Sequence, residues 1–227
     1  MTITSLLFDF DGLILDTETT DIEAWRVIYA EYGFDYPKEN WSQTVGGWGA
    51  SDFDPARYLH QLTHDSLDVE TLRKRHHHES EVLILRQPIL DGVEDYLLQA
   101  PHLGLRLAIV SSSPHSWIDN QLSRLGLTMH FEKIICGDDI TPGHTKPQPD
   151  IYIKALDELG ITPSEAIALE DSPNGVTAAR LVGIFVVAVP NTTTLQLKIE
   201  GADLTVPSLA SLPLQELLAR AAQRAPT

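Results

Sequence analysis

An apolar run near the N-terminus ends in two aspartates and a glycine, where residues 6–12 read LLFDFDG. Such apolar residues are typical of a buried strand, whereas aspartate is a poor strand former and is costly to bury. In an extended chain residues i and i+2 face the same side, so the side chains of Asp9 and Asp11 can converge while Gly12 lets the backbone turn beneath them. Two carboxylates held this close indicate a bound cation, a shared proton or both, although an acid-rich turn after a strand would give the same pattern.

Further apolar runs of strand length recur along the chain, and helical patterns lie between most of them. The runs cover residues 5–10, 105–110, 133–136, 166–169 and 184–189. The helical patterns cover residues 93–99, 115–125, 151–159 and 176–181. Strands that alternate with helices predict an α/β fold, with a Rossmann-like parallel sheet as its core.

The first crossover of this predicted sheet is unusually long. Residues 16–88 contain no convincing strand, and helical patterns cover residues 21–32, 55–62 and 69–85. About seventy residues far exceed what a strand-to-helix connection needs. We therefore expect a small helical cap domain, residues 16–88, inserted into an α/β core of residues 1–15 and 89–227. Such an insert would lie above the carboxyl ends of the strands, where sheets of this kind bind ligands.

Three further motifs carry candidate functional residues. Ser111 and Ser112 follow a predicted strand and offer hydroxyl and backbone N–H groups to an anion. Lys146 lies in a segment that nearby prolines stiffen, so its ammonium is delivered with less loss of entropy. Glu170 and Asp171 end another buried strand. Taken singly, these motifs also fit a serine-rich helix cap, a solvated lysine and a capping aspartate.

Taken together, Asp9, Asp11, Glu170 and Asp171 would gather up to four negative charges. Like charges about 4 Å apart repel by roughly 4 kcal/mol at an effective dielectric of 20, so the cluster requires a proton or a cation. Oxygen ligands favour a hard cation such as Mg²⁺ over zinc. With Lys146 and the serines nearby, the site can accept a phosphate even though the chain has a formal net charge of −16.

Composition restricts the partners and the compartment. The net charge of −16 argues against nucleic acid and anionic membranes as partners. One cysteine, Cys136, excludes an intramolecular disulfide. No N-terminal secretory pattern and no apolar run of about 20 residues occurs, so we expect a cytoplasmic protein. Nothing in the sequence requires a dimer, and we expect a monomer.

In this order the motifs resemble the haloacid dehalogenase superfamily, and most closely its branch with a small helical cap after strand one. That branch includes β-phosphoglucomutase, phosphoglycolate phosphatase and sugar-phosphate phosphatases. The resemblance covers nearly the whole chain. It implies a Mg²⁺-dependent phosphatase that hydrolyses small phosphorylated metabolites, such as sugar phosphates, through an aspartyl-phosphate intermediate.

The resemblance also implies roles for single residues. Asp9 resembles the nucleophile that attacks phosphorus, and Asp11 resembles the general acid/base. The Ser111 hydroxyl and the Ser112 backbone N–H would bind the phosphoryl group, and Lys146 would neutralise charge beside the nucleophile.

The implied metal site uses some of the same residues. Asp171 would hold Mg²⁺ together with the Asp9 side chain and the Asp11 backbone carbonyl. Glu170 would be either a further ligand or an outer partner. A dehalogenase needs no proton-donating aspartate two residues after its nucleophile, so Asp11 favours phosphoryl transfer.

Departures from related enzymes favour a phosphatase over a phosphomutase, which remains the alternative. The similar mutases carry a cap histidine twelve residues after the nucleophile, where this chain has Asp21. They also place an arginine in a cap loop, where residues 46–51 read GGWGAS. Phosphonoacetaldehyde hydrolases use a lysine early in the insert, whereas the first one here, Lys38, lies in an expected turn. A catalytically inactive protein that binds a metabolite is the least favoured reading.

Two groups in the predicted insert have more than one interpretation. Trp41, Trp48 and Phe53 either shape a substrate pocket or pack in the core of the insert. His76 and its two histidine neighbours point about 100° apart on a helix and do not share a face, so we interpret them as a solvated helix surface rather than a metal site.

Overall fold

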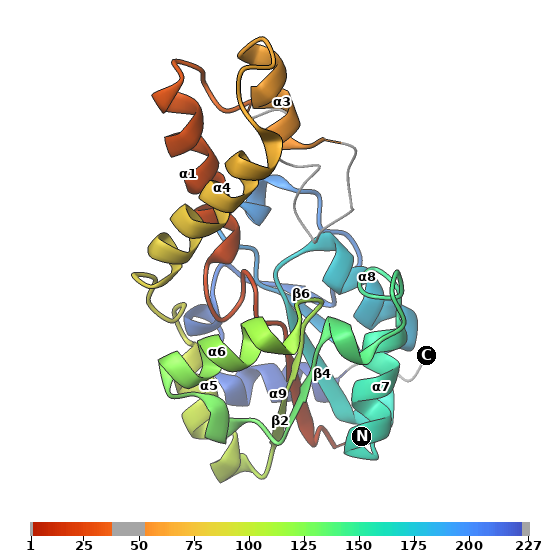
Figure 1. The fold of residues 1–227 in the computed structure, drawn as a ribbon. Helices are drawn as coiled ribbons and strands as arrows, with labels where there is room; N and C mark the ends of the chain where they lie inside the picture. The colour runs from red at the N-terminus through yellow and green to blue at the C-terminus, as the bar shows by residue number, and fades with distance from the viewer. Residues whose placement is uncertain (1, 38–52, 224–227) are drawn as a thin grey trace. The chain divides into compact units, whose positions relative to one another are not determined.

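The computed structural model describes residues 2–37 and 53–223 of the 227-residue chain. The chain divides into two compact units, Met1–Leu15 with Ile89–Thr227 and Asp16–Pro88, which we call the core unit and the insert unit (Figure 1). In the described residues the core unit is α/β and the insert unit is helical. Across these same residues, no helix combines the length and the apolar character needed to cross a bilayer.

A six-stranded parallel sheet forms the centre of the core unit, in the order β3-β2-β1-β4-β5-β6. The strands are β1 (Ser5–Phe8), β2 (Arg106–Val110), β3 (Lys133–Ile135), β4 (Ala166–Glu170), β5 (Phe185–Ala188) and β6 (Leu204–Thr205). Every residue of β1 and β4 is buried, as expected for central parallel strands that are covered on both faces. The predicted α/β fold is therefore confirmed.

The helices of the core unit include α5 (Val93–Gln99), α6 (His115–Leu125), α7 (Asp150–Leu159), α8 (Pro173–Val182) and α9 (Leu214–Ala222). Short 3-10 helices are η1 (Pro101–Leu103), η2 (Thr128–His130), η3 (Gly137–Asp139), η4 (Pro163–Glu165), η5 (Thr194–Gln196) and η6 (Leu209–Ser211). Helices α7 and α8 pack against the sheet through a buried cluster that includes Leu7, Tyr152 and Val176. Burial of each Leu or Val side chain contributes about 1.5–3 kcal/mol to this packing.

Strand β1 ends at Phe8, two residues before its predicted end. The backbone N–H of Asp9 still donates to the Leu169 carbonyl at 3.0 Å, after which the chain leaves the sheet. Gly12 has a φ of +81°, which a residue with a side chain rarely adopts, so the expected turn beneath the aspartates is present. Strand β6 and helix α9 were not predicted.

The insert unit contains α1 (Thr17–Glu31), α3 (Pro55–Leu62) and α4 (Val69–Ile84). Each begins after an aspartate that accepts a hydrogen bond from a backbone N–H of the first turn. Asp16 accepts from Thr19 at 3.0 Å, and Asp68 accepts from Thr71 at 2.7 Å. Helices α1 and α4 contact each other extensively, and the Tyr29 hydroxyl donates to the Pro55 carbonyl at 2.7 Å. Capping by Asp and burial of the apolar faces explain why these segments are helical.

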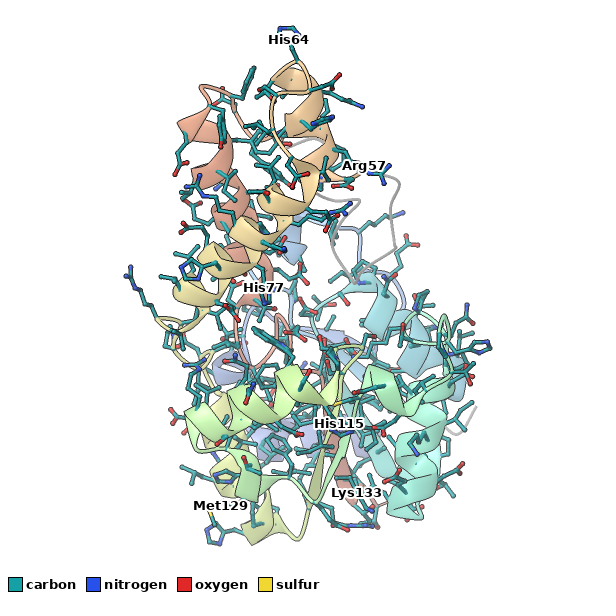
Figure 2. The ribbon with its side chains drawn as sticks, viewed as in Figure 1. Arg57, His64, His77, His115, Met129 and Lys133 are labelled. Atoms are coloured by element: carbon teal, nitrogen blue, oxygen red, sulfur yellow. The ribbon has the colours of Figure 1, made fainter. Side chains whose placement is uncertain are left out.

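The prediction of a solvated histidine surface is wrong for His76. Its ring stacks on Trp25 with centroids 4.2 Å apart, and its Nε2 lies 3.0 Å from the Asp21 carbonyl oxygen. His77, in contrast, has a side chain that is 73% exposed (Figure 2). One histidine of the three thus packs between helices α4 and α1, which agrees with the 100° angle between successive side chains.

Several residues singled out in the sequence lie outside the described residues. They are Lys38, Trp41 and residues 46–51, which include Trp48. Phe53 is described, and its ring centroid lies 5.6 Å from that of Tyr58 on α3. This contact agrees with packing within the insert, which was one of the two interpretations of Phe53.

Candidate active site

The candidate residues of the core unit come from the carboxyl ends of neighbouring strands. Strands β1 and β4 pair in parallel with Phe8 opposite Leu169, so Asp9 and Glu170 follow at the same edge of the sheet. Ser111 directly follows β2, the other neighbour of β1. Because these strands start and end in register, residues far apart in the sequence meet at one edge, as the sequence predicted.

Lys146 reaches this edge from the segment between η3 and α7. Its Nζ lies 2.9 Å from Asp9 Oδ1 and 2.7 Å from Glu170 Oε1, and its side chain is 5% exposed. The hydroxyl of Tyr152 donates a hydrogen bond to the same Oε1 atom. One ammonium therefore lies between two buried carboxylates, so the interpretation of Lys146 as a solvated surface lysine is excluded.

The electrostatics of this group follow from its burial. Burial lowers the pKa of Lys146, but the charges of Asp9 and Glu170 outweigh this effect and hold the pKa well above its ordinary value. Burial raises the pKa of Glu170 to about 8, the Asp9 charge adds to this, and Lys146 offsets the rise only in part. Lys146 therefore stays charged, while the site favours a proton or another cation beside Glu170.

Three carboxylates at this edge fit a hard divalent cation. Asp9, Glu170 and Asp171 are buried, and each offers an oxygen within 4.8 Å of the oxygens of the other two. Glu170 Oε2 is buried and has no hydrogen-bond partner among the described residues. An all-oxygen donor set with an unsatisfied buried oxygen fits Mg²⁺. The side chain of Asp11 is not part of this group, which is compatible with the expectation that only its carbonyl would bind the metal.

The backbone and one amide side chain hold Asp171 in place. A Cβ atom on Gly12 would overlap the Asp171 carboxylate and would lie 2.8 Å from Asn191 Nδ2. Asn191 Nδ2 donates to Asp171 Oδ2 at 2.9 Å and to the Gly12 carbonyl at 3.1 Å. Asn191 was not predicted as a site residue. It follows shortly after β5, the strand that pairs with β4, and this position in the sequence is the signal that would have indicated it.

Asp11 has a different set of partners from Asp9. Its Oδ2 accepts from Ser113 Oγ at 2.6 Å and from Ser111 Oγ at 3.3 Å, and its Oδ1 accepts from Trp117 Nε1 at 2.9 Å. Ser112 Oγ is buried without a hydrogen-bond partner among the described residues. Ser113 and Trp117 were not predicted as site residues; Ser113 lies just before α6, and Trp117 lies in the first turn of this helix.

The family model described as Haloacid dehalogenase-like hydrolase matches residues 6–189, from within β1 to just past the end of β5, and this range includes all of the residues above except Asn191. The chain is a haloacid dehalogenase-like hydrolase. This membership confirms the resemblance drawn from the motifs, and the parallel sheet agrees with it.

Similar proteins place the chain in the phosphatase- and β-phosphoglucomutase-like branch of this family. YhcW of Bacillus subtilis, whose name proposes a phosphatase activity, is 38% identical over 216 residues, which are 95% of this chain and 96% of YhcW. A phosphorylated carbohydrates phosphatase of Thermotoga maritima is 30% identical over 188 residues, 79% of this chain and 82% of that protein. The crystal structure of CbbY from Rhodobacter sphaeroides in complex with phosphate has a TM-score of 0.72 and 25% identity, and covers 95% of this chain and 99% of CbbY.

Proposed function

We propose that this hydrolase is a Mg²⁺-dependent phosphatase of small phosphate monoesters, and that its substrates are sugar phosphates or related phosphorylated metabolites. The observation that carries the proposal is the buried Asp9 carboxylate beside Lys146, with Glu170 and Asp171 within 4.8 Å of it. The name of YhcW proposes a phosphatase activity, and a second relative is named a phosphorylated carbohydrates phosphatase; both names support the same reaction class.

In the proposed reaction an oxygen of the Asp9 carboxylate attacks phosphorus, and the bond from phosphorus to the leaving oxygen breaks. The carboxyl group of Asp11 gives its proton to the leaving oxygen, which departs as an alcohol. The resulting aspartyl-phosphate is then attacked by water, from which the Asp11 carboxylate removes a proton. Inorganic phosphate leaves, and both aspartates return to their starting states.

Binding of the phosphoryl group is assigned to the Ser111 hydroxyl, the Ser112 backbone N–H and the Lys146 ammonium. Because Lys146 is held by Asp9 and Glu170, its position is fixed before substrate enters, which removes an ordering cost from the reaction. We place Mg²⁺ on Asp9, Asp171 and the Asp11 carbonyl, with Glu170 as a further ligand or an outer partner. When bound, the ion neutralises carboxylate and phosphoryl charge and orients the phosphoryl oxygens.

The insert unit, residues 16–88, is proposed as the cap that selects the leaving group of the substrate. A phosphomutase would need this unit to handle a second phosphate. Asp21 stands where the similar mutases carry a histidine, so a second phosphate would lack that imidazole here. This feature favours release of phosphate over transfer within one sugar.

The test measures release of inorganic phosphate from p-nitrophenyl phosphate and from a panel of phosphorylated sugars, with Mg²⁺. Asp9→Asn should abolish turnover, whereas Asp157→Asn, a change at an exposed carboxylate of α7, should have no effect. With Asp11→Asn and p-nitrophenyl phosphate, whose leaving group needs no proton, a phosphorylated peptide that contains Asp9 should accumulate after acid quenching. Turnover by Asp9→Asn would refute the mechanism, and full activity in excess chelator would refute the metal assignment. Transfer of label between two positions of one sugar phosphate would instead favour the phosphomutase.

A further inference from the structure

The Asp11 carboxylate is held by two side chains, those of Ser113 and Trp117, that the proposed mechanism does not use. Both of its oxygens accept hydrogen bonds, Oδ1 from the indole Nε1 of Trp117 at 2.9 Å and Oδ2 from the Ser113 hydroxyl at 2.6 Å. Ser111 Oγ is a longer third donor, at 3.3 Å from Oδ2. These donors fix the plane of the carboxylate as well as its position, because they approach both oxygens.

The backbone that carries these donors is itself held by hydrogen bonds. Helix α6 begins after Pro114, and the Trp117 backbone N–H donates to the Pro114 carbonyl at 3.0 Å. The Ser113 backbone N–H donates to Ser111 Oγ at 3.1 Å, and the Ser113 carbonyl accepts from the Gly137 N–H at 2.9 Å. The segment before α6 is thus tied to both the serine motif and η3. Because these donors are already fixed, they lose little conformational entropy when they hold the Asp11 carboxyl.

The two main donors differ in what they can do when Asp11 changes its protonation state. The indole N–H of Trp117 can only donate, and it does not titrate at working pH. The Ser113 hydroxyl can donate to a carboxylate and, after rotation, accept from a carboxylic acid. A proton on Oδ1 would face a permanent donor, whereas a proton on Oδ2 would face a hydroxyl that can turn to accept it. The Ser113 hydroxyl can therefore keep its contact with Oδ2 whether Asp11 is ionised or protonated.

We propose that Trp117 and Ser113 are positioning residues that hold the Asp11 carboxyl for its proton transfers. The inference rests on the acid/base role given to Asp11 under the proposed function. It adds two residues that contact neither the phosphoryl group nor the metal-binding atoms in the proposed scheme, since their side chains donate to the carboxylate oxygens of Asp11. Their effect should therefore depend on how much the leaving group needs a proton.

The experiment compares kcat/KM across phosphate monoesters whose leaving groups range from nitrophenol to alkyl alcohols. Nitrophenolate leaves without a proton, whereas an alkoxide requires one, so the dependence of rate on leaving-group pKa reports the acid. Trp117→Phe keeps a large ring and removes the donor, and Ser113→Ala removes the hydroxyl. We expect Trp117→Phe to lower kcat/KM about tenfold or more for alkyl esters and less than about threefold for p-nitrophenyl phosphate, within the span of acid catalysis.

The control variants separate this role from a loss of fold. Ser116→Ala changes an exposed serine next to Trp117 and should leave every ester unaffected. Ser113→Thr keeps a hydroxyl and should restore the leaving-group dependence that Ser113→Ala loses. An equal fall for all esters with Trp117→Phe, or no fall for any of them, would overturn the inference. If Asp11→Asn itself leaves the alkyl esters unaffected, the proposed function fails instead, because no acid acts at that position.

Discussion

Replacement of Glu170 by glutamine should stabilise the metal-free protein and weaken its binding of Mg²⁺. Glu170 is fully buried, and Lys146 Nζ and the Tyr152 hydroxyl both donate to its Oε1. Glutamine has nearly the same shape and keeps an oxygen for both donors. The change therefore removes mainly the titratable charge.

The size of the effect follows from the pKa of Glu170, which burial and the Asp9 charge raise from 4.5 to about 8. Between these values the native protein holds a proton that the unfolded chain has lost, so stability falls as pH rises through this window. The loss grows by about 1.4 kcal/mol for each pH unit and reaches roughly 3 kcal/mol at about pH 7. Glutamine does not titrate and therefore avoids this loss. Its amide nitrogen, however, would take the place of Oε2, which has no partner among the described residues, and a buried donor left without a partner costs about 1 kcal/mol. We expect a net gain of about 2 kcal/mol.

The assay is urea unfolding of chelator-treated protein, followed by circular dichroism at several pH values. The gain from Glu170→Gln should be largest near pH 8 and should turn into a loss of about 1 kcal/mol well below about pH 4.5, where wild-type Glu170 is protonated in both states. Glu94→Gln, at an exposed site on α5, is the matched control and should show no such dependence. With saturating Mg²⁺ the wild type should gain more stability than the variant, because ligand binding stabilises the native state in proportion to affinity. A loss of stability that is the same at every pH would refute the reasoning.

Two further predictions concern the backbone and a histidine of the core unit. Gly12→Ala should lower the free energy of unfolding by about 2 kcal/mol or more, since the new Cβ would overlap the Asp171 carboxylate at a φ of +81°. Gly33→Ala, at a φ of +79° with nothing within 4 Å, measures the backbone strain alone, and an equal loss in both would exclude the overlap as the cause. Burial lowers the pKa of His115 (Figure 2), but the hydrogen bond to Asp139 and nearby carboxylates raise it above its ordinary value. The stability that this pairing contributes is therefore present below about pH 6.5 and lost at higher pH, so His115→Asn should destabilise more near pH 5 than near pH 9 in urea unfolding, and an equal loss at both would contradict the pairing.

The parts of the fold that could be predicted are those where burial and strand direction leave little choice. Apolar runs of strand length that alternate with helical patterns predict a parallel sheet, and the ends of parallel strands meet at one edge. This rule alone brings Asp9, Ser111 and Glu170 together without any knowledge of their contacts. Strand β6, two residues long, and helix α9 lack a comparable signal in the sequence.

The contacts that could not be predicted come from residues whose types fit an ordinary structural role. Tyr152 lies on the buried face of α7, where its type fits ordinary core packing, yet its hydroxyl donates a hydrogen bond to Glu170. Trp117 reads as an apolar position of an amphipathic helix, yet its indole N–H reaches Asp11. His76 reads as one of three solvated histidines until its stacking on Trp25 is known. A sequence pattern fixes which face a side chain lies on, whereas its polar partner depends on atoms of other elements.

The charge balance of the site explains why a stability cost is retained there. Asp9, Asp11, Glu170 and Asp171 are four acidic groups, and Lys146 is the ammonium held among them, so the fully ionised cluster has a formal charge of −3. A phosphate dianion would not enter such a cluster in a chain of net charge −16 unless a cation or protons came first. A buried charged cluster is in general poor at stabilising a fold, since hydrophobic residues of the same volume often do better. The raised pKa of Glu170 reflects this cost, because burial and the Asp9 charge both disfavour the ionised form of its carboxyl group. The uncompensated negative charge that destabilises the metal-free protein would also attract a divalent cation. The bound cation would in turn allow the phosphate dianion to bind.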